Sequence, residues 1–209
     1  MRRNFKTISL TLVLALLLSL IIPFSTATAE NQPTLITIIH TNDTHARVLE
    51  DAYDGMGFGK IATAVKQIKQ ENPNVILVDA GDTLHGLPIA TISRGESIVK
   101  ILNALKYDVM APGNHDFNYG QERLVELVEG MDFPMICANI YKDGASLFTP
   151  YIIREVAGIK LAFFGLATPE TAYKTNPKNV EGIEFKDPVA VAEKMVKELE
   201  GKADYIIAV

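Results

Sequence analysis

The chain has 209 residues, of which 48% are hydrophobic and 22% are charged, an ordinary composition for a globular protein. Its formal net charge is −5, which argues against binding to a nucleic-acid polymer through the phosphate backbone. A small phosphorylated substrate is still compatible with this charge, because metal ions can supply positive charge locally.

The first 29 residues have the three parts of a secretory signal peptide. Arg2 and Lys6 belong to a basic start, residues 8–22 are almost wholly apolar, and small residues lead up to Ala29. The alternative is an uncleaved membrane anchor, but the apolar run is shorter than the roughly 20 residues that span a bilayer. We therefore expect cleavage after Ala29, contact with the membrane only during export, and a mature protein in the periplasm, the cell wall or the medium.

Apolar runs and amphipathic stretches alternate along the rest of the chain. Short runs rich in β-branched residues predict strands, and apolar residues at helical spacing predict helices. In chain order we predict a strand at 34–40, a helix at 59–71, a strand at 75–78, a helix at 96–107, a strand at 108–110, a helix at 121–130, a strand at 133–140, a hairpin of strands at 151–156 and 160–166, a helix at 187–201 and a strand at 203–209. This alternation predicts an α/β fold in which helices cover a largely buried sheet.

Three polar clusters follow directly after predicted strands. They are Asp43-Thr44-His45, Gly81-Asp82-Thr83 and Gly113-Asn114-His115-Asp116. Because the carboxyl ends of strands form the ligand crevice of an open α/β sheet, we expect these side chains to converge. Carboxylate, imidazole and amide oxygen are suitable ligands for divalent metal ions. The glycines allow sharp turns and keep bulk away from the site.

These clusters resemble the motif set of the calcineurin-like metallophosphoesterases. The longer runs 39–45, 82–86 and 113–120 look like the 5′-nucleotidase branch, and the resemblance covers the chain from about Leu35 onward. It implies a layered β-sandwich flanked by helices, which holds two divalent metal ions drawn from Mn, Zn, Mg, Fe and Co.

The resemblance also implies a role for each matching residue. Asp43 and His45 would hold the first metal ion, and Asp82 would bridge both. Asn114 would bind the second ion through its amide oxygen. His115 matches the catalytic histidine of the family, which lies near the scissile phosphate.

One position departs from the pattern of many 5′-nucleotidases. Three residues after His115 they have an aspartate that pairs with the histidine, whereas this chain has Asn118. Asparagine can orient the imidazole but cannot stabilise its cation by charge. Family members with asparagine here act on 2′,3′-cyclic nucleotides and 3′-nucleotides. The neighbouring Asp116 is expected to point elsewhere.

The leading hypothesis is an exported hydrolase of nucleotide phosphate esters, similar to a 5′-nucleotidase and serving nucleotide catabolism. The alternatives are a 2′,3′-cyclic-nucleotide 2′-phosphodiesterase/3′-nucleotidase and a non-catalytic binding protein on the same fold. In each case the expected partner is a small nucleotide.

The family completes its metal site with further histidines downstream. This chain has four histidines, at positions 40, 45, 85 and 115. We therefore expect residues 30–209 to be the N-terminal part of a metallophosphoesterase domain, truncated at its C-terminus and inactive by itself. We interpret His40 and His85 as ordinary histidines of a strand end and a loop, and Cys137 as a small apolar side chain in a buried strand.

Overall fold

The computed structural model describes residues 33–52 and 55–209. The chain divides into two compact units, residues 1–34 and 35–209, and the helices and strands below belong to the second. The predicted signal peptide, with its cleavage position at Ala29, lies outside the described residues. Within those residues, no helix is long and apolar enough to cross a membrane.

Three parallel strands form the first sheet, in the order β1-β2-β3. They are β1 (Thr37–Thr41), β2 (Val75–Asp79) and β3 (Val109–Met110). All five residues of the central strand β2 are buried, as expected for a parallel strand that is covered on both faces. The three predicted strand ends therefore meet at one edge of a single sheet.

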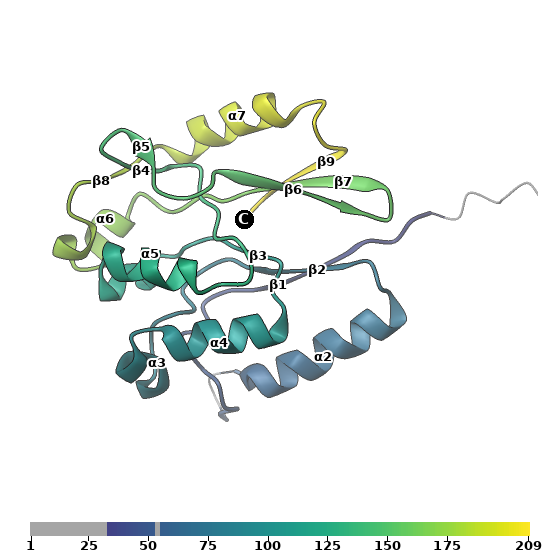
Figure 1. Cartoon of the computed structure of the whole chain (residues 1–209), viewed down its shortest axis with the longest axis horizontal. Coiled ribbons are helices and arrows are strands. Elements are labelled where there is room, and N and C mark those ends of the chain that lie inside the picture. Colours follow the sequence, from purple (N-terminus) through teal and green to yellow (C-terminus); the bar gives the residue numbers. More distant parts are fainter. Residues whose placement is uncertain (1–32, 53–54) are drawn as a thin grey trace, which may run out of the picture. The chain divides into compact units, whose positions relative to one another are not determined.

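Two amphipathic helices, α2 (Gly57–Glu71) and α4 (Glu96–Leu105), cover one face of this sheet (Figure 1). In α4 the side chains of Ile98, Val99 and Leu102 are buried. Val99 and Leu102 belong to the face that predicted the helix, Ile98 adds to it, and Leu105 of that face is only partly buried.

The second sheet contains β6 (Tyr151–Val156), β7 (Ile159–Phe164) and β9 (Tyr205–Ala208). β6 and β7 form the predicted antiparallel hairpin, and β9 pairs with β7 in parallel. The hairpin turns at Ala157 and Gly158, which both have positive φ, 52° and 80°. Positive φ at both central positions is what the twist of a two-residue hairpin favours.

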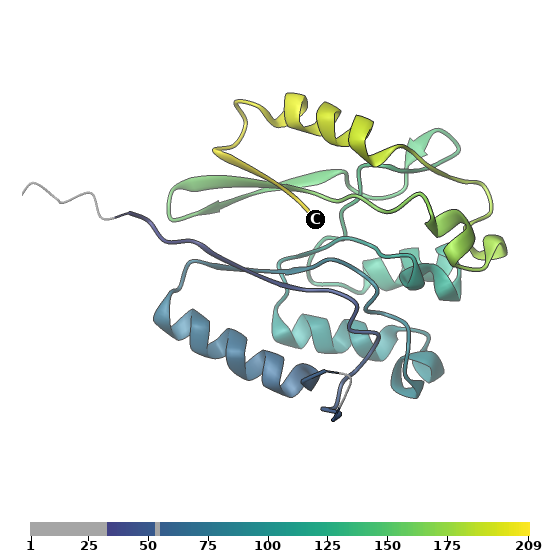
Figure 2. The same ribbon diagram turned by 180° about the vertical axis from the view of Figure 1, so that it is seen from behind.

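The elements stack in four layers, and both views agree on their order (Figure 1 and Figure 2). Helices α2 and α4 are followed by the first sheet, the second sheet and finally α7 (Pro188–Leu199). Pro188 occupies the first turn of α7, and the Asp187 side chain caps it by accepting a hydrogen bond from the Ala190 N–H at 2.8 Å. This arrangement confirms the predicted sandwich flanked by helices.

Alternating side chains of β7 belong to two separate hydrophobic cores. Leu161 and Phe163 pack against the first sheet, where they meet residues such as Val78. Ala162 and Phe164 pack in a different cluster, against α7. Because side chains alternate between the two faces of a strand, β7 packs against the first sheet on one face and against α7 on the other.

A smaller sheet and several short helices complete the unit. The sheet has the order β5-β4-β8. Its strands are β4 (Ile140–Lys142), β5 (Ala145–Ser146) and β8 (Ile183–Phe185), and the remaining helices are α3 (Pro88–Ser93), η1 (His115–Tyr119), α5 (Gln121–Glu129), α6 (Thr171–Lys174) and η2 (Pro177–Val180).

The predicted strand at 133–140 is wrong as a continuous element. Its residues are buried as expected, but they make only isolated bridges, from Met135 to Met110 and from Ile136 to Thr149. The next backbone bond, from the Ala138 N–H, goes to Gly165. The segment passes from one partner to the next, so no ladder forms until β4 begins at Ile140.

Replacing Phe163 by alanine tests the contact between the two sheets. Phe163 is completely buried in that core, so Phe163→Ala should lower the free energy of unfolding by about 3–5 kcal/mol, measured by urea denaturation. The control is Ile92→Ala on α3, where the side chain is 86% exposed and the expected change is within about 0.5 kcal/mol. Equal losses in the two variants would contradict the layered packing.

Candidate metal and phosphate site

The loops after β1 and β2 run side by side beyond the ends of the strands. The backbone N–H of Asp43 donates to the Gly81 carbonyl at 2.9 Å, and that of His45 donates to the Asp82 carbonyl at 3.0 Å. These bonds extend the parallel pairing of the sheet into the polar loops, which fixes the ligand-bearing residues relative to each other.

Asp43, His45 and Asp82 form a cluster that can hold a metal ion. One ligand atom of each residue lies within 4.8 Å of the other two, and the cluster ranges from exposed at Asp43 to half-buried at the other two. The His45 Nε2 atom is 3.9 Å from Asp43 Oδ1. Two carboxylates and an imidazole are a suitable donor set for Mn, Zn or Fe, so these residues fit the ions that the family resemblance implies.

All three cluster residues have left-handed backbone conformations. Their φ values are 52° at Asp43, 44° at His45 and 55° at Asp82. Residues other than glycine adopt this region at an energetic cost, and such positions concentrate at functional sites. The three candidate ligands thus share this conformation, which also occurs at turns elsewhere in the chain, such as at Ala157.

The second and third loops touch through two glycines. Gly81 has a φ of 93°, and a Cβ atom there would overlap the backbone of Gly113. A Cβ atom on Gly113 would in turn overlap the Asp82 carboxylate. Both positions therefore require glycine, because a side chain at position 81 would push against Gly113 and one at position 113 would push against Asp82.

The buried Asp116 carboxylate joins the same two loops. Its Oδ1 accepts hydrogen bonds from the N–H groups of Thr83 and Leu84, at 3.0 and 2.9 Å. Its Oδ2 accepts from those of Asp82 and Gly113, at 2.9 and 2.8 Å. Burial raises the pKa of Asp116 to about 6, against the opposing effect of the backbone donors. All four of these partners are backbone N–H groups.

A second buried carboxylate, Asp79, ends β2. It accepts hydrogen bonds from the hydroxyls of Thr41 and Thr83, at 2.6 and 3.0 Å. The backbone N–H of Gly81 also donates to it, at 3.0 Å. Burial is the largest influence on Asp79 and raises its pKa to about 7. This network was not predicted, because Asp79 follows the predicted strand at 75–78 and lies outside the three polar clusters.

His115 begins η1, directly after the half-buried Asn114, and lies beside the cluster. Its backbone N–H donates to Asp82 Oδ1 at 2.6 Å, and its ring centroid is 5.1 Å from that of His45. The Nδ2 atom of Asn118 is 2.9 Å from His115 Nδ1, so Asn118 can orient this imidazole as predicted. The third loop therefore brings a second imidazole to the carboxylate cluster.

His85 and Thr175 also reach Asn118. The Asn118 amide contacts His85 Nδ1 at 3.0 Å and accepts a hydrogen bond from the Thr175 hydroxyl at 2.8 Å. His85 is therefore more than the ordinary loop histidine that we expected. By contrast, His40 is exposed on β1. The buried Cys137 thiol has its pKa raised by burial to about 11, which agrees with an unreactive apolar role.

The calcineurin-like phosphoesterase family matches residues 36–209 of this chain. The chain belongs to this family. Its motif-bearing loops lie at the edge of the sheet where the strand ends were expected to converge.

This phosphoesterase is similar to several 5′-nucleotidases. A 5′-nucleotidase of Vibrio cholerae serotype O1 is 39% identical over 182 residues, which cover 83% of this chain and 33% of the relative. The solved calcineurin-like phosphoesterase YfkN from Bacillus subtilis is 30% identical with a TM-score of 0.73, covering 82% of this chain and 60% of that chain. A 5′-nucleotidase precursor from Thermus thermophilus, also 30% identical at a TM-score of 0.73, is matched over 82% of this chain and 36% of that chain. The chain spans about a third of the length of the curated relatives it matches.

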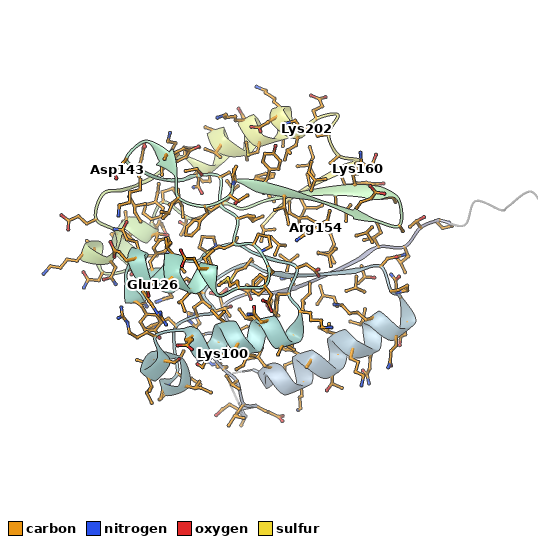
Figure 3. All side chains as sticks on the ribbon, in the orientation of Figure 1. Lys100, Glu126, Asp143, Arg154, Lys160 and Lys202 are labelled. Atoms are coloured by element: carbon orange, nitrogen blue, oxygen red, sulfur yellow. The ribbon has the colours of Figure 1, made fainter. Side chains whose placement is uncertain are left out.

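Replacing Asp116 by asparagine tests the link between the second and third loops of this phosphoesterase. Asp116→Asn puts an NH₂ group against backbone N–H donors, so the free energy of unfolding should fall by about 2–4 kcal/mol in urea denaturation. The matched control is Asp143→Asn in the exposed turn between β4 and β5 (Figure 3), expected to change it by less than about 0.5 kcal/mol. A neutral Asp116→Asn would show that the carboxylate does not hold the loops.

The raised pKa of Asp79 predicts that the metal-free protein loses stability as the pH rises. Burial favours the neutral carboxyl in the folded state, so its contribution is complete below about pH 4 and is lost up to about pH 7. Asp79 alone should make the free energy of unfolding about 3 kcal/mol higher at pH 5 than at pH 8. In Asp79→Asn, the difference in the free energy of unfolding between pH 5 and pH 8 should fall to the part that Asp116 contributes. An unchanged difference would contradict the assignment to Asp79.

Proposed function

We propose that this chain forms the reaction centre of an exported, metal-dependent phosphoesterase that hydrolyses nucleotide phosphate esters, as 5′-nucleotidases do. The observation that carries the proposal is the cluster of Asp43, His45 and Asp82 within 4.8 Å. His115 lies directly beside it, at the carboxyl edge of the first sheet. The similarity to 5′-nucleotidases supports nucleotides as the substrate class.

The ligands proposed for two divalent metal ions are Asp43, His45, Asp82 and Asn114. When bound, such ions supply positive charge for an in-line phosphoryl displacement and a water nucleophile at neutral pH. The chain's own contribution is to hold these ligands at fixed positions. Asp116 and the two glycines hold the second loop against the third, and this contact fixes the proposed ligands on both loops.

His115 is proposed as the residue that contacts the scissile phosphate. Asn118 holds its Nδ1 edge, which leaves the Nε2 edge free to hydrogen-bond a phosphate oxygen or the departing ester oxygen. Residues 1–29 are proposed to direct export, which would place the mature protein in the periplasm, the cell wall or the medium.

A second candidate is a 2′,3′-cyclic-nucleotide 2′-phosphodiesterase/3′-nucleotidase. It is favoured by the amide of Asn118 at the His115 Nδ1 atom. An amide N–H can donate to neutral imidazole, but it gives the imidazolium no compensating negative charge. A histidine held in this way is suited to donate a hydrogen bond as a neutral group.

His115→Asn tests the proposed chemistry in the complete protein, expressed from the whole reading frame that contains this chain. With Mn²⁺, kcat should fall about 10²–10⁴-fold while metal content stays unchanged. The matched control is His40→Asn. The His40 side chain is exposed on β1, so this variant should keep wild-type activity. Asp82→Asn should instead lose bound metal, measured by equilibrium dialysis.

The substrate panel is AMP, 3′-AMP and 2′,3′-cyclic AMP. Preference for AMP supports the 5′-nucleotidase proposal, and preference for the other two supports the second candidate. Tight nucleotide binding without hydrolysis of any of them would leave the non-catalytic binding protein as the explanation.

A further inference from the structure

One amide group lies between two imidazoles beside the metal-ligand cluster. The Nδ2 atom of Asn118 is 2.9 Å from His115 Nδ1 and 3.0 Å from His85 Nδ1. An asparagine NH₂ group carries two hydrogens, which is the number needed to donate to both rings. Asn118 therefore couples His85, which no part of the proposed mechanism uses, to the proposed catalytic histidine.

The side-chain oxygen and the backbone carbonyl of Asn118 also accept hydrogen bonds. The hydroxyl of the buried Thr175 donates to Asn118 Oδ1 at 2.8 Å, and the Asn179 side chain donates to the Asn118 carbonyl at 2.9 Å. These partners come from the segment around α6 and η2, which is distant in sequence. They hold the amide with its oxygen toward Thr175 and its NH₂ group toward the two histidines.

This orientation sets the tautomer of both rings. A nitrogen that accepts a hydrogen bond carries no proton, so neutral His85 and His115 would both be protonated at Nε2. Nδ1 and Nε2 lie on opposite edges of an imidazole, so both Nε2–H groups face away from Asn118. Desolvation by burial, followed by the charges of His115 and His45, lowers the pKa of His85 and favours its neutral form.

The rings of His85 and His115 are nearly parallel. Their planes differ by only 10°, and their centroids are 6.1 Å apart. The His115 centroid lies 5.1 Å from that of His45, and the His85 centroid lies 5.1 Å from that of Tyr119. His85 does not belong to the cluster of Asp43, His45 and Asp82, and it remains partly exposed.

We propose that His85 is a substrate-binding residue that donates its Nε2–H to the leaving-group side of the ester, at a sugar oxygen beyond the scissile bond. Asn118 and Thr175 are positioning residues for it. The inference rests on the proposed function, because it takes His115 as the group facing the phosphate. His85 would act as a second hydrogen-bond donor next to His115, and this donor would select for the group attached to the phosphate.

Kinetics of the complete protein test this role with two kinds of substrate. For the preferred nucleotide, His85→Ala should raise KM about 10-fold and change kcat less than about 3-fold, as expected when one ground-state hydrogen bond is lost. For 4-nitrophenyl phosphate, whose leaving group has no sugar, KM should change less than about 2-fold. Equal effects on both substrates, or no effect on either, would overturn the proposal.

His85→Gln separates hydrogen bonding from packing. Glutamine can accept from Asn118 through Oε1 and donate through Nε2, so it should restore KM to within about 3-fold of wild type. A His85→Gln variant as impaired as His85→Ala, while both unfold like wild type in urea, would also count against the proposal.

Nitrogen-15 NMR of the histidine side chains gives a readout that needs no turnover. In the metal-free complete protein, with signals assigned from His85→Gln and His115→Gln, both rings should be Nε2–H tautomers, and Asn118→Asp should convert them to Nδ1–H. Millimolar AMP should shift the His85 signal, whereas inorganic phosphate should shift only that of His115. Nδ1–H tautomers in the wild type, or a His85 signal that AMP leaves unmoved, would refute the inference. If the protein hydrolyses no ester but these NMR results hold, the proposed function fails and the binding role of His85 stands.

Discussion

The candidate site depends on one buried carboxylate that satisfies four backbone N–H groups. Asp116 accepts hydrogen bonds from two loops that belong to different strands, and its burial makes each of those bonds difficult to replace with water. Around it, Gly81 and Gly113 let the loops approach within a distance that no side chain would permit. The candidate metal ligands depend on this support, so their geometry is set by residues outside the ligand cluster.

Much of this arrangement could be predicted from the sequence, because its determinants are local. The β-branched runs that became β1 and β2 end at polar residues, and parallel strands must end at a common edge. The hairpin of β6 and β7 and the capped start of α7 carry equally local signals in their turn and cap residues. The sequence motifs could likewise indicate Asp43, His45 and Asp82 as neighbours.

The parts that escaped prediction depend on distant partners. The segment 133–140 has the apolar pattern of a strand, yet it changes partner from residue to residue as it passes between the sheets. Its burial was predictable and its pairing was not. The coupling of His85 to Asn118 joins residues 33 positions apart, and Thr175 lies a further 57 positions from Asn118. No periodicity in the sequence encodes such contacts.

Transplanting this centre into another scaffold would require more than its ligand side chains. Asp43, His45 and Asp82 all sit on left-handed backbone, so a helix or a regular strand of a host protein would aim the same side chains elsewhere. A designer would have to graft the three loops as one block, together with the carboxylate that ties the second to the third. The three loops with their backbone conformations therefore have to be transferred together, because the ligand side chains alone would not keep their positions.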